Sequence, residues 1–120
     1  MQASVAACSF YFFSLEDAGF VAKDATSAEV VPQTYLELGR TACSLSELEL
    51  SNFPGGQERA KWLCADLVYV FVLLTVGFGI QANSSILAMK ELTSPRGLNY
   101  TASWTLGLAL QLAHVRNRRL

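Results

Sequence analysis

The chain has few of the side chains on which metal sites and nucleophilic active sites depend. Its 120 residues include one histidine, His114, and three cysteines, Cys8, Cys43 and Cys64, with no Cys-x-x-Cys pair. A zinc site or a cysteine–histidine catalytic pair therefore has too few ligands or partners. An odd number of cysteines does not by itself define a disulfide framework.

An excess of charge of either sign is also lacking. Nine basic and ten acidic residues leave a formal net charge of −1. Nucleic-acid-binding domains usually carry a basic stripe, so the composition gives no electrostatic support for a nucleic-acid partner. Apolar residues make up 52% of the chain, which excludes a disordered class, and the length suits one domain at most, residues 1–120.

The first residues do not have the pattern of a secretory signal peptide. Residues 1–13 are apolar, but no charged segment precedes them and no small-residue cleavage site follows. Their valine, phenylalanine and tyrosine content favours a buried β-strand over residues 4–13. Because this strand lies so near the first residue, we expect a chain cut from a larger protein.

Turn and capping patterns divide the middle of the chain. Thr34 and Glu37 have the spacing of a capping box, which predicts a helix over residues 34–43. Residues 45–57 are polar and end in Pro-Gly-Gly, so they are expected to form a loop.

The second half is expected to hold a helix, a strand and a final helix. The most apolar stretch, residues 59–76, predicts a helix that stops at Gly77. A strand over residues 86–92 and a helix over residues 103–115, capped by Ser103, follow. The mixed order of strands and helices indicates an α/β fold.

The apolar segment at residues 63–80 has two interpretations. Its 18 residues reach the lower limit for crossing a bilayer, although Asp66 near one end makes a span costly. A helix that is apolar on all sides equally suits the centre of a folded domain. Sequence physics alone leaves both interpretations open.

Four motifs stand in order along the chain: Ser9-Phe10-Tyr11-Phe12, Asp17-Ala18-Gly19-Phe20-Val21, the run Trp62-Leu63-Cys64-Ala65-Asp66-Leu67-Val68-Tyr69 with Leu73-Leu74 and Gly77-Phe78-Gly79, and Ser103-Trp104-Thr105-Leu106-Gly107. This ordered set resembles the C-terminal portion of the apyrases, the family of nucleoside triphosphate diphosphohydrolases and guanosine diphosphatases. The third motif is similar to the family's "LCMDLxY…LL…GFG" run, and the fourth to its last Trp-x-Leu-Gly motif.

The resemblance implies a partial C-terminal lobe of a two-lobed α/β protein of the actin and RNase H-like type. Complete members remove terminal phosphate from nucleoside di- and triphosphates, with Ca²⁺ or Mg²⁺ on the phosphate oxygens and a glutamate-activated water as nucleophile. The family's Asp-x-Gly-Ser-type phosphate loops and catalytic glutamate belong to earlier motifs, and this chain has no Asp-x-Gly-Ser. We therefore expect no catalytic residue and no direct metal ligand here, and a hydrolase fragment that is inactive alone.

Three residues are the nucleotide-binding candidates that the resemblance implies. Trp104 matches a tryptophan near the nucleotide-bound metal, where its N–H can orient a water of the metal's shell. Arg59 has the spacing to Cys64 of an arginine that lies against the nucleobase, and Tyr11 matches an aromatic that stacks on the other face. The alternatives are an aromatic packing at a helix start and a solvated surface arginine.

The chain departs from the family pattern close to the proposed site. Thr101 stands where an acidic residue is usual, three positions before the tryptophan. Val76 stands where soluble members tend to have an acid, and Ala65 replaces the methionine of "LCMDL". These differences weaken the expectation that the chain supports a metal shell.

The family also implies a disulfide between Cys43 and Cys64, with Cys8 as a free, buried thiol on a strand. Such a bond indicates an oxidising compartment. The implied location is the lumen of the secretory pathway, membrane-associated or extracellular, with membrane association through segments outside this chain.

Two other function classes stay open. One is a small membrane protein with a single span at residues 63–80, which an alkaline wash would leave in the membrane fraction. The other is a non-catalytic remnant that binds a full-length relative and would purify together with it.

Asn83-Ser84-Ser85 and Asn99-Tyr100-Thr101 both fit the N-glycosylation pattern. If the chain enters the secretory lumen, we expect a glycan at Asn83, which follows Gly79 in a polar turn, more than at Asn99, which lies near the proposed cleft. Endoglycosidase treatment of secreted protein should increase its gel mobility, and Asn83→Gln should remove most of the shift. Unchanged mobility would contradict both sites.

Overall fold

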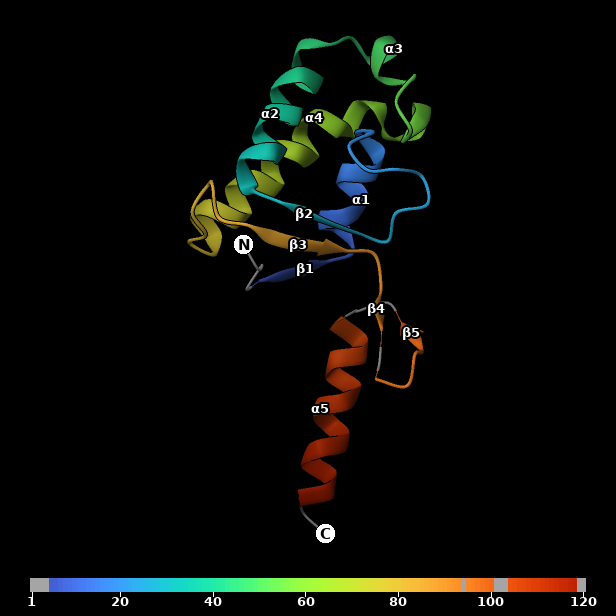
Figure 1. Ribbon diagram of the computed structural model, residues 1–120, viewed down its shortest axis with the longest axis vertical. Helices are drawn as coiled ribbons and strands as arrows, with labels where there is room; N and C mark the ends of the chain where they lie inside the picture. The colour runs from blue at the N-terminus through green and yellow to red at the C-terminus, as the bar shows by residue number, and fades with distance from the viewer. Residues whose placement is uncertain (1–4, 94, 101–103, 119–120) are drawn as a thin grey trace. The chain divides into compact units, whose positions relative to one another are not determined.

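A computed structural model describes residues 5–93, 95–100 and 104–118 of the chain. The chain divides into two compact units, Met1–Lys90 and Glu91–Leu120. The elements of the first unit are, in order, β1 (Ala6–Cys8), α1 (Phe10–Asp17), β2 (Ser27–Val30), α2 (Pro32–Ser44), α3 (Glu47–Leu50), α4 (Gly56–Val72), the π-helical segment η1 (Leu73–Gly77) and β3 (Ile86–Met89) (Figure 1).

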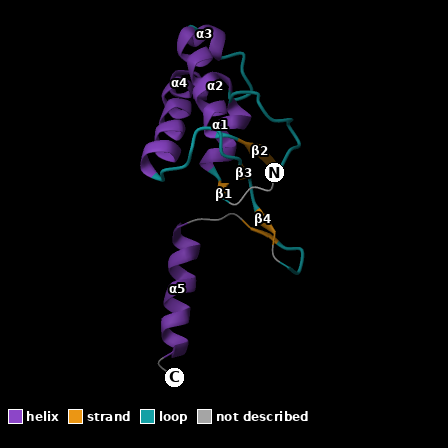
Figure 2. Ribbon diagram, turned by 60° about the vertical axis from the view of Figure 1, so that its left-hand side comes forward, coloured by secondary structure: helices purple, strands orange, loops and turns teal. Residues whose placement is uncertain are grey.

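The first unit consists of a three-stranded sheet with helices covering one of its faces. The strand order is β1-β3-β2, with β1 parallel and β2 antiparallel to β3. Helices α1, α2 and α4 lie together on one side of this sheet (Figures 1 and 2). The register aligns Ala7 with Ala88, and Val30 with Ile86, and these four side chains are buried. The α/β class predicted from the sequence is confirmed.

Helices α2 and α4 form the main helix contact of the unit. On α4, the buried residues recur at intervals of three and four, which places them on one face: Ala60, Leu63, Leu67 and Val70. On α2, a Cβ at Gly39 would lie 3.0 Å from Cγ2 of Val68, so glycine permits the close approach. A disulfide joins Cys43 to Cys64 with Cα atoms 4.8 Å apart, as the family resemblance implied.

The first predicted strand is much shorter than expected. Only Ala6–Cys8 is a strand, and the chain turns at Ser9, whose φ is +59°, into helix α1. Phe12 and Leu15 are fully buried three residues apart, a spacing that places both on one helix face. A continuous apolar run cannot distinguish a strand from a buried helix, so the prediction over residues 4–13 was wrong beyond Cys8.

The predicted cap of the next helix was also wrong. Helix α2 begins at Pro32, two residues before Thr34, and its N-cap residue is Val31 without a side-chain cap. Proline at the first helical position is favoured because its fixed φ suits the helix and its absent N–H needs no partner there. The predicted helix itself is present and slightly longer.

A capping box does occur, in the segment that was expected to be a loop. Ser46 Oγ accepts a hydrogen bond from the Glu49 N–H at 3.2 Å, and Glu49 Oε1 accepts one from the Ser46 N–H at 3.2 Å. These bonds satisfy donors at the start of the short helix α3, which packs against α4.

The second unit holds a hairpin and a helix. Strands β4 (Leu92–Thr93) and β5 (Asn99–Tyr100) pair antiparallel, and α5 (Trp104–Arg118) follows. The strand predicted over residues 86–92 is therefore two strands in different units, β3 and β4. The predicted final helix is present, whereas its proposed cap, Ser103, lies outside the described residues.

One helical segment of the described chain, Gly56–Gly77, is long and apolar enough to cross a membrane by length and composition. This segment passes the test even though one of its faces, with Ala60, Leu63, Leu67 and Val70, is buried, and α4 packs against α2. The same test is met by core helices of soluble proteins, so it is weak support for a span.

Loss of the Cys43–Cys64 bond should lower the free energy of unfolding. The two cysteines are 21 positions apart in the sequence. For a loop of this length, the chain-entropy model gives a stabilisation of the folded state of about 3 kcal/mol. Urea unfolding of Cys64→Ser, followed by far-UV circular dichroism, should show a lower midpoint. Cys8→Ser is the control and should unfold near the wild-type midpoint; equal shifts in both variants would contradict the disulfide's role.

Candidate functional site

Arg59 lies between two carboxylates at the start of α4. Its Nε donates to Oδ2 of Asp17 at 3.3 Å, and its guanidinium also bonds Oδ2 of Asp66. Asp17 is the last residue of α1, and Asp66 lies seven residues further along α4, two helical turns away. The arginine therefore ties α1 to α4 through part-buried ion pairs.

The electrostatics of Asp17 depend on this arginine. Burial raises the pKa of the Asp17 carboxyl above its ordinary value, while the hydrogen bond and the charge of Arg59 act in the opposite direction and lower it. Neighbouring Glu16 and Asp66 raise it further. Arg59 thus partly offsets the effect of burial on the pKa of Asp17, in addition to any role toward a ligand.

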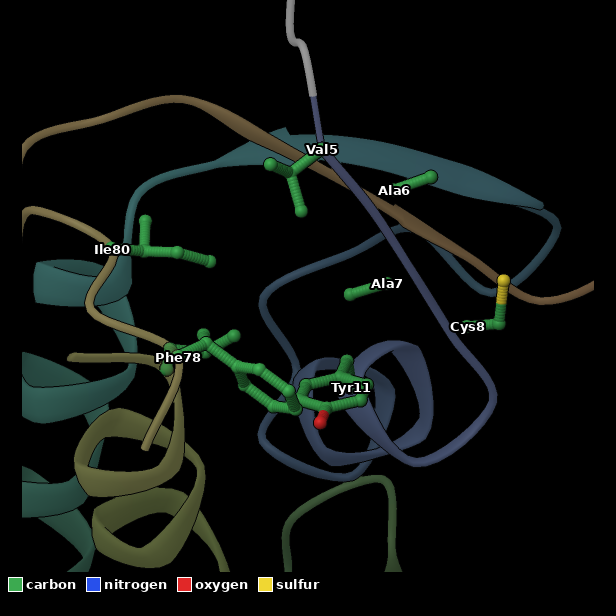
Figure 3. A pocket seen from close by; sticks show the side chains of 8 residues that line it. Val5, Ala6, Ala7, Cys8, Tyr11, Phe78 and Ile80 are labelled. Carbon is green, nitrogen blue, oxygen red and sulfur yellow. The ribbon is translucent and has the colours of Figure 1, made fainter. Parts of the chain in front are cut away.

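Tyr11 lies in helix α1, not in a strand, and lines an apolar pocket. The pocket has a volume of about 480 Å³ and is lined by Val5, Ala6, Ala7, Cys8, Tyr11, Leu74, Phe78 and Ile80. In Figure 3 the side chains of Tyr11 and Phe78 extend into the space between β1 and the end of η1. Burial and the nearby Tyr69 raise the pKa of Tyr11, so its phenol stays neutral at physiological pH.

A second tyrosine fixes the position of α1. The fully buried Tyr35 of α2 donates its hydroxyl hydrogen bond to the backbone oxygen of Tyr11 at 2.6 Å. Burial raises the pKa of Tyr35, and Tyr11 adds to this. A buried phenol with a satisfied hydrogen bond holds the two helices in a fixed relation.

The remaining candidate residues are on several elements of the described chain. Arg59 is not among the residues that line the Tyr11 pocket. Trp104 is the first residue of α5 in the second unit, and its side chain lies outside what the structure describes, as does Thr101. Asn83 is exposed in the turn before β3, and Asn99 lies in β5. Cys8 is free, and it is half-buried, where a buried thiol was expected.

One Asp-x-Gly spacing was not among the features expected from the sequence. Asp17-Ala18-Gly19 has the Asp-x-Gly order of a phosphate loop, although Phe20 stands where such a loop has serine. Asp17 ends α1, where the helix dipole is negative, and its carboxylate is paired with Arg59. Gly19 has a φ of +76°, which suits a helix stop. This segment ends a helix and offers no positive site for phosphate.

The donors in the described part of the chain do not fit a bound Ca²⁺ or Mg²⁺. These ions take several carboxylate or carbonyl oxygens. Among the residues that the structure describes, no group of three His, Cys, Asp or Glu side chains is close enough to hold a metal ion. Asp17 and Asp66 instead share the guanidinium of Arg59.

The chain is similar to plant proteins over nearly all of its length. It is 32% identical over 114 residues to "Probable apyrase 1" of Oryza sativa subsp. japonica, covering 93% of this chain and 23% of that protein. It is 31% identical over 113 residues to the "Apyrase" of Solanum tuberosum and 30% over 113 residues to the "Nucleoside-triphosphatase" of Pisum sativum, each covering 92% of this chain and 25% of the relative. The chain thus spans about a quarter of these relatives' length. No protein-family model matches it.

Replacement of Arg59 by glutamine should raise the pKa of Asp17, because two contributions that lower it are removed. A carboxyl with a raised pKa in the folded state favours folding when protonated, and this contribution is lost as pH rises through that pKa. The variant should therefore lose more stability than wild type between acid and neutral pH, by about 1 kcal/mol at neutrality. Carboxyl NMR titration and urea unfolding measure both effects.

Arg40→Gln, which changes an exposed arginine of α2, is the matched control. It should leave the titration of Asp17 unchanged. If Arg59→Gln and Arg40→Gln titrate alike, the ion pairs do not control Asp17.

Proposed function

Because the chain is related to the apyrase family over about a quarter of such a protein's length, we propose that it is the C-terminal portion of an apyrase-like hydrolase. In complete form this hydrolase removes terminal phosphate from nucleoside di- and triphosphates. The observation that carries the proposal is similarity along nearly the whole of this chain to relatives about four times as long. The chain alone is expected to be inactive.

The proposal includes the type of lobe to which this sheet and its helices belong. The mixed sheet with helices on one face supports a place within an actin or RNase H-like lobe. Such a lobe needs more strands than the three of this unit, and the rest of the parent protein would supply them.

Nucleotide contacts are proposed for three residues. The Arg59 side chain is 40% exposed while its nitrogens bond two carboxylates, which leaves a guanidinium face for stacking on a base. Tyr11 offers an aromatic ring at an apolar pocket. Trp104 would act through its indole N–H on a water of the metal shell.

The divalent cation is proposed as part of the complete enzyme. Ca²⁺ or Mg²⁺ bound there would neutralise charge on the phosphate oxygens. Its oxygen ligands, and the base that positions the attacking water, would come from outside this chain. The residues here would bind and orient the nucleoside.

The secretory lumen or the cell exterior is the proposed location. The Cys43–Cys64 bond supports it, because structural disulfides persist in oxidising compartments. The exposed sequon at Asn83 is compatible with this location.

The isolated chain should release no phosphate from ATP, ADP or GDP in the presence of Ca²⁺ or Mg²⁺. Phosphoryl transfer requires charge-neutralising groups and a base near the attacking water. Among the described residues, no group of three His, Cys, Asp or Glu side chains could hold the metal ion that neutralises the phosphate charge. Phosphate release by purified chain, measured beside Trp104→Ala, should equal background for both proteins. Turnover that Trp104→Ala abolishes would show a complete site in this chain and overturn the proposal.

A further inference from the structure

The charged side chains are divided unequally between the two units. Residues 1–90 contain nine acidic and five basic residues, whereas residues 91–120 contain four arginines and one acidic residue, Glu91. The formal charges are therefore −4 and +3, although the whole chain carries only −1. A charge asymmetry of this kind between two parts of a chain is typical of a basic segment that binds an anionic partner.

Three of the four arginines lie at the end of the last helix. Arg116 and Arg118 are in the last turn of α5, and Arg119 follows in the sequence. Helix α5 contains no acidic residue, so no carboxylate of its own can pair with them at a spacing of three or four. The negative end of the helix dipole amounts to about half an elementary charge and does not neutralise two arginines.

The same helix leaves its apolar side chains uncovered. All side chains that the structure describes in α5, those of residues 107–118, are exposed, Leu110 by 63% and Leu112 by 61% (Figure 2). Leu108, Leu112 and Val115 recur at intervals of four and three, which places them on one face of the helix. An exposed apolar face on a helix with a positive end needs a partner that is both apolar and anionic.

The polar residues of α5 lie on a second face. Gln111, His114 and Arg118 recur at intervals of three and four. Arg116 follows Leu112 by four positions, so it lies one turn further along the apolar face. Its methylene groups can stay on that face while its guanidinium extends to a phosphate. Leucine on one face and arginine beside it is the composition of helices that lie at the surface of a bilayer.

The length of α5 and its side chains exclude the other modes of binding. Its 15 residues are roughly 22 Å long, shorter than the hydrocarbon core of about 30 Å that a span must cross. A nucleic acid would bind the arginines through its phosphates but would leave the leucines uncovered. A second copy in parallel alignment would bring arginines against arginines, and like charges at an interface disfavour binding.

We propose that α5 binds the surface of bilayers that contain anionic lipids. Its arginines pair with the headgroups, and Leu108, Leu112 and Val115 enter the boundary between headgroups and acyl chains. The charge of −4 on residues 1–90 is repelled by such a surface, so the contact is confined to the second unit. This site is distinct from a span at residues 63–80 and from attachment through segments outside this chain. It does not rest on the proposed function.

Vesicle flotation of the purified full chain tests the proposal. The vesicles contain phosphatidylcholine alone, or phosphatidylcholine and phosphatidylserine at about three to one. Wild-type chain should float with the phosphatidylserine vesicles and stay unbound with phosphatidylcholine alone. Raising NaCl from about 0.1 M to about 1 M should release it, because the screening length falls from about 10 Å to about 3 Å. Aggregated protein sediments, so it is not counted as bound.

Exposed positions provide variants with matched controls. Arg116→Gln together with Arg118→Gln should lower the partition coefficient about 25-fold, at about five-fold for each arginine. Arg40→Gln, on an exposed arginine of α2, should bind as wild type does. Leu112→Asn should lower the partition coefficient about ten-fold or more. Leu48→Asn, on a leucine of α3 that is 80% exposed, is its control.

Several outcomes would overturn the inference. These are no flotation of wild type, equal flotation with and without phosphatidylserine, and equal loss in a variant and its control. Flotation that Val76→Asn abolishes and Leu112→Asn does not would place the lipid on the helix that contains residues 56–77. Without flotation, a dimer that Leu112→Asn dissolves would make a second copy the partner, and duplex DNA binding that the double arginine variant abolishes would make it a nucleic acid.

Discussion

The close approach of α2 to α4 is the contact on which the rest of the first unit depends. Gly39 lets the two helices meet at Val68, and the Cys43–Cys64 bond fixes the same pair one turn further along. The helices are antiparallel, because later residues of α2 meet earlier residues of α4. Helix α1 packs against α4, and buried residues of α2, α4 and the sheet belong to one core cluster.

Charge and hydrogen bonding then place α1 on that layer. Tyr35 holds the backbone of Tyr11 near one end of α1, and Arg59 holds Asp17 at the other end. Both interactions join residues more than 20 positions apart in sequence. The two residues that the family resemblance relates to a nucleobase are thus also the residues that position this helix. A ligand at either place would bind to a framework that is already fixed.

The sequence predicted the features that depend on local periodicity and on family motifs. The apolar stretch that stops at Gly77 predicted the helix over residues 59–76, and the segment 34–43 was predicted to be the helix that α2 contains. The cysteines matched to the family predicted the disulfide. The limit of β1 could not be predicted, because residues 10–13 are apolar at every position and the turn arises from an unusual φ at Ser9. The ion pairs of Arg59 could not be predicted either, since they join residues 42 positions apart. The Ser46–Glu49 capping box was readable from the sequence.

The two interpretations of the apolar helix come from two faces of the same segment. Its inner face, with Leu63, Leu67 and Val70, is buried against the unit. Its outer face exposes Trp62, Tyr69, Val72 and Val76, at intervals that place them on one stripe. A helix on the surface of a complete domain normally has a polar outer face. Apolar character on both faces is typical of a helix that lies between two packed layers, and only one of those layers is formed by this chain's first unit. The composition that satisfies a test for membrane spans is therefore equally explained by a second protein layer over Tyr69 and Val72.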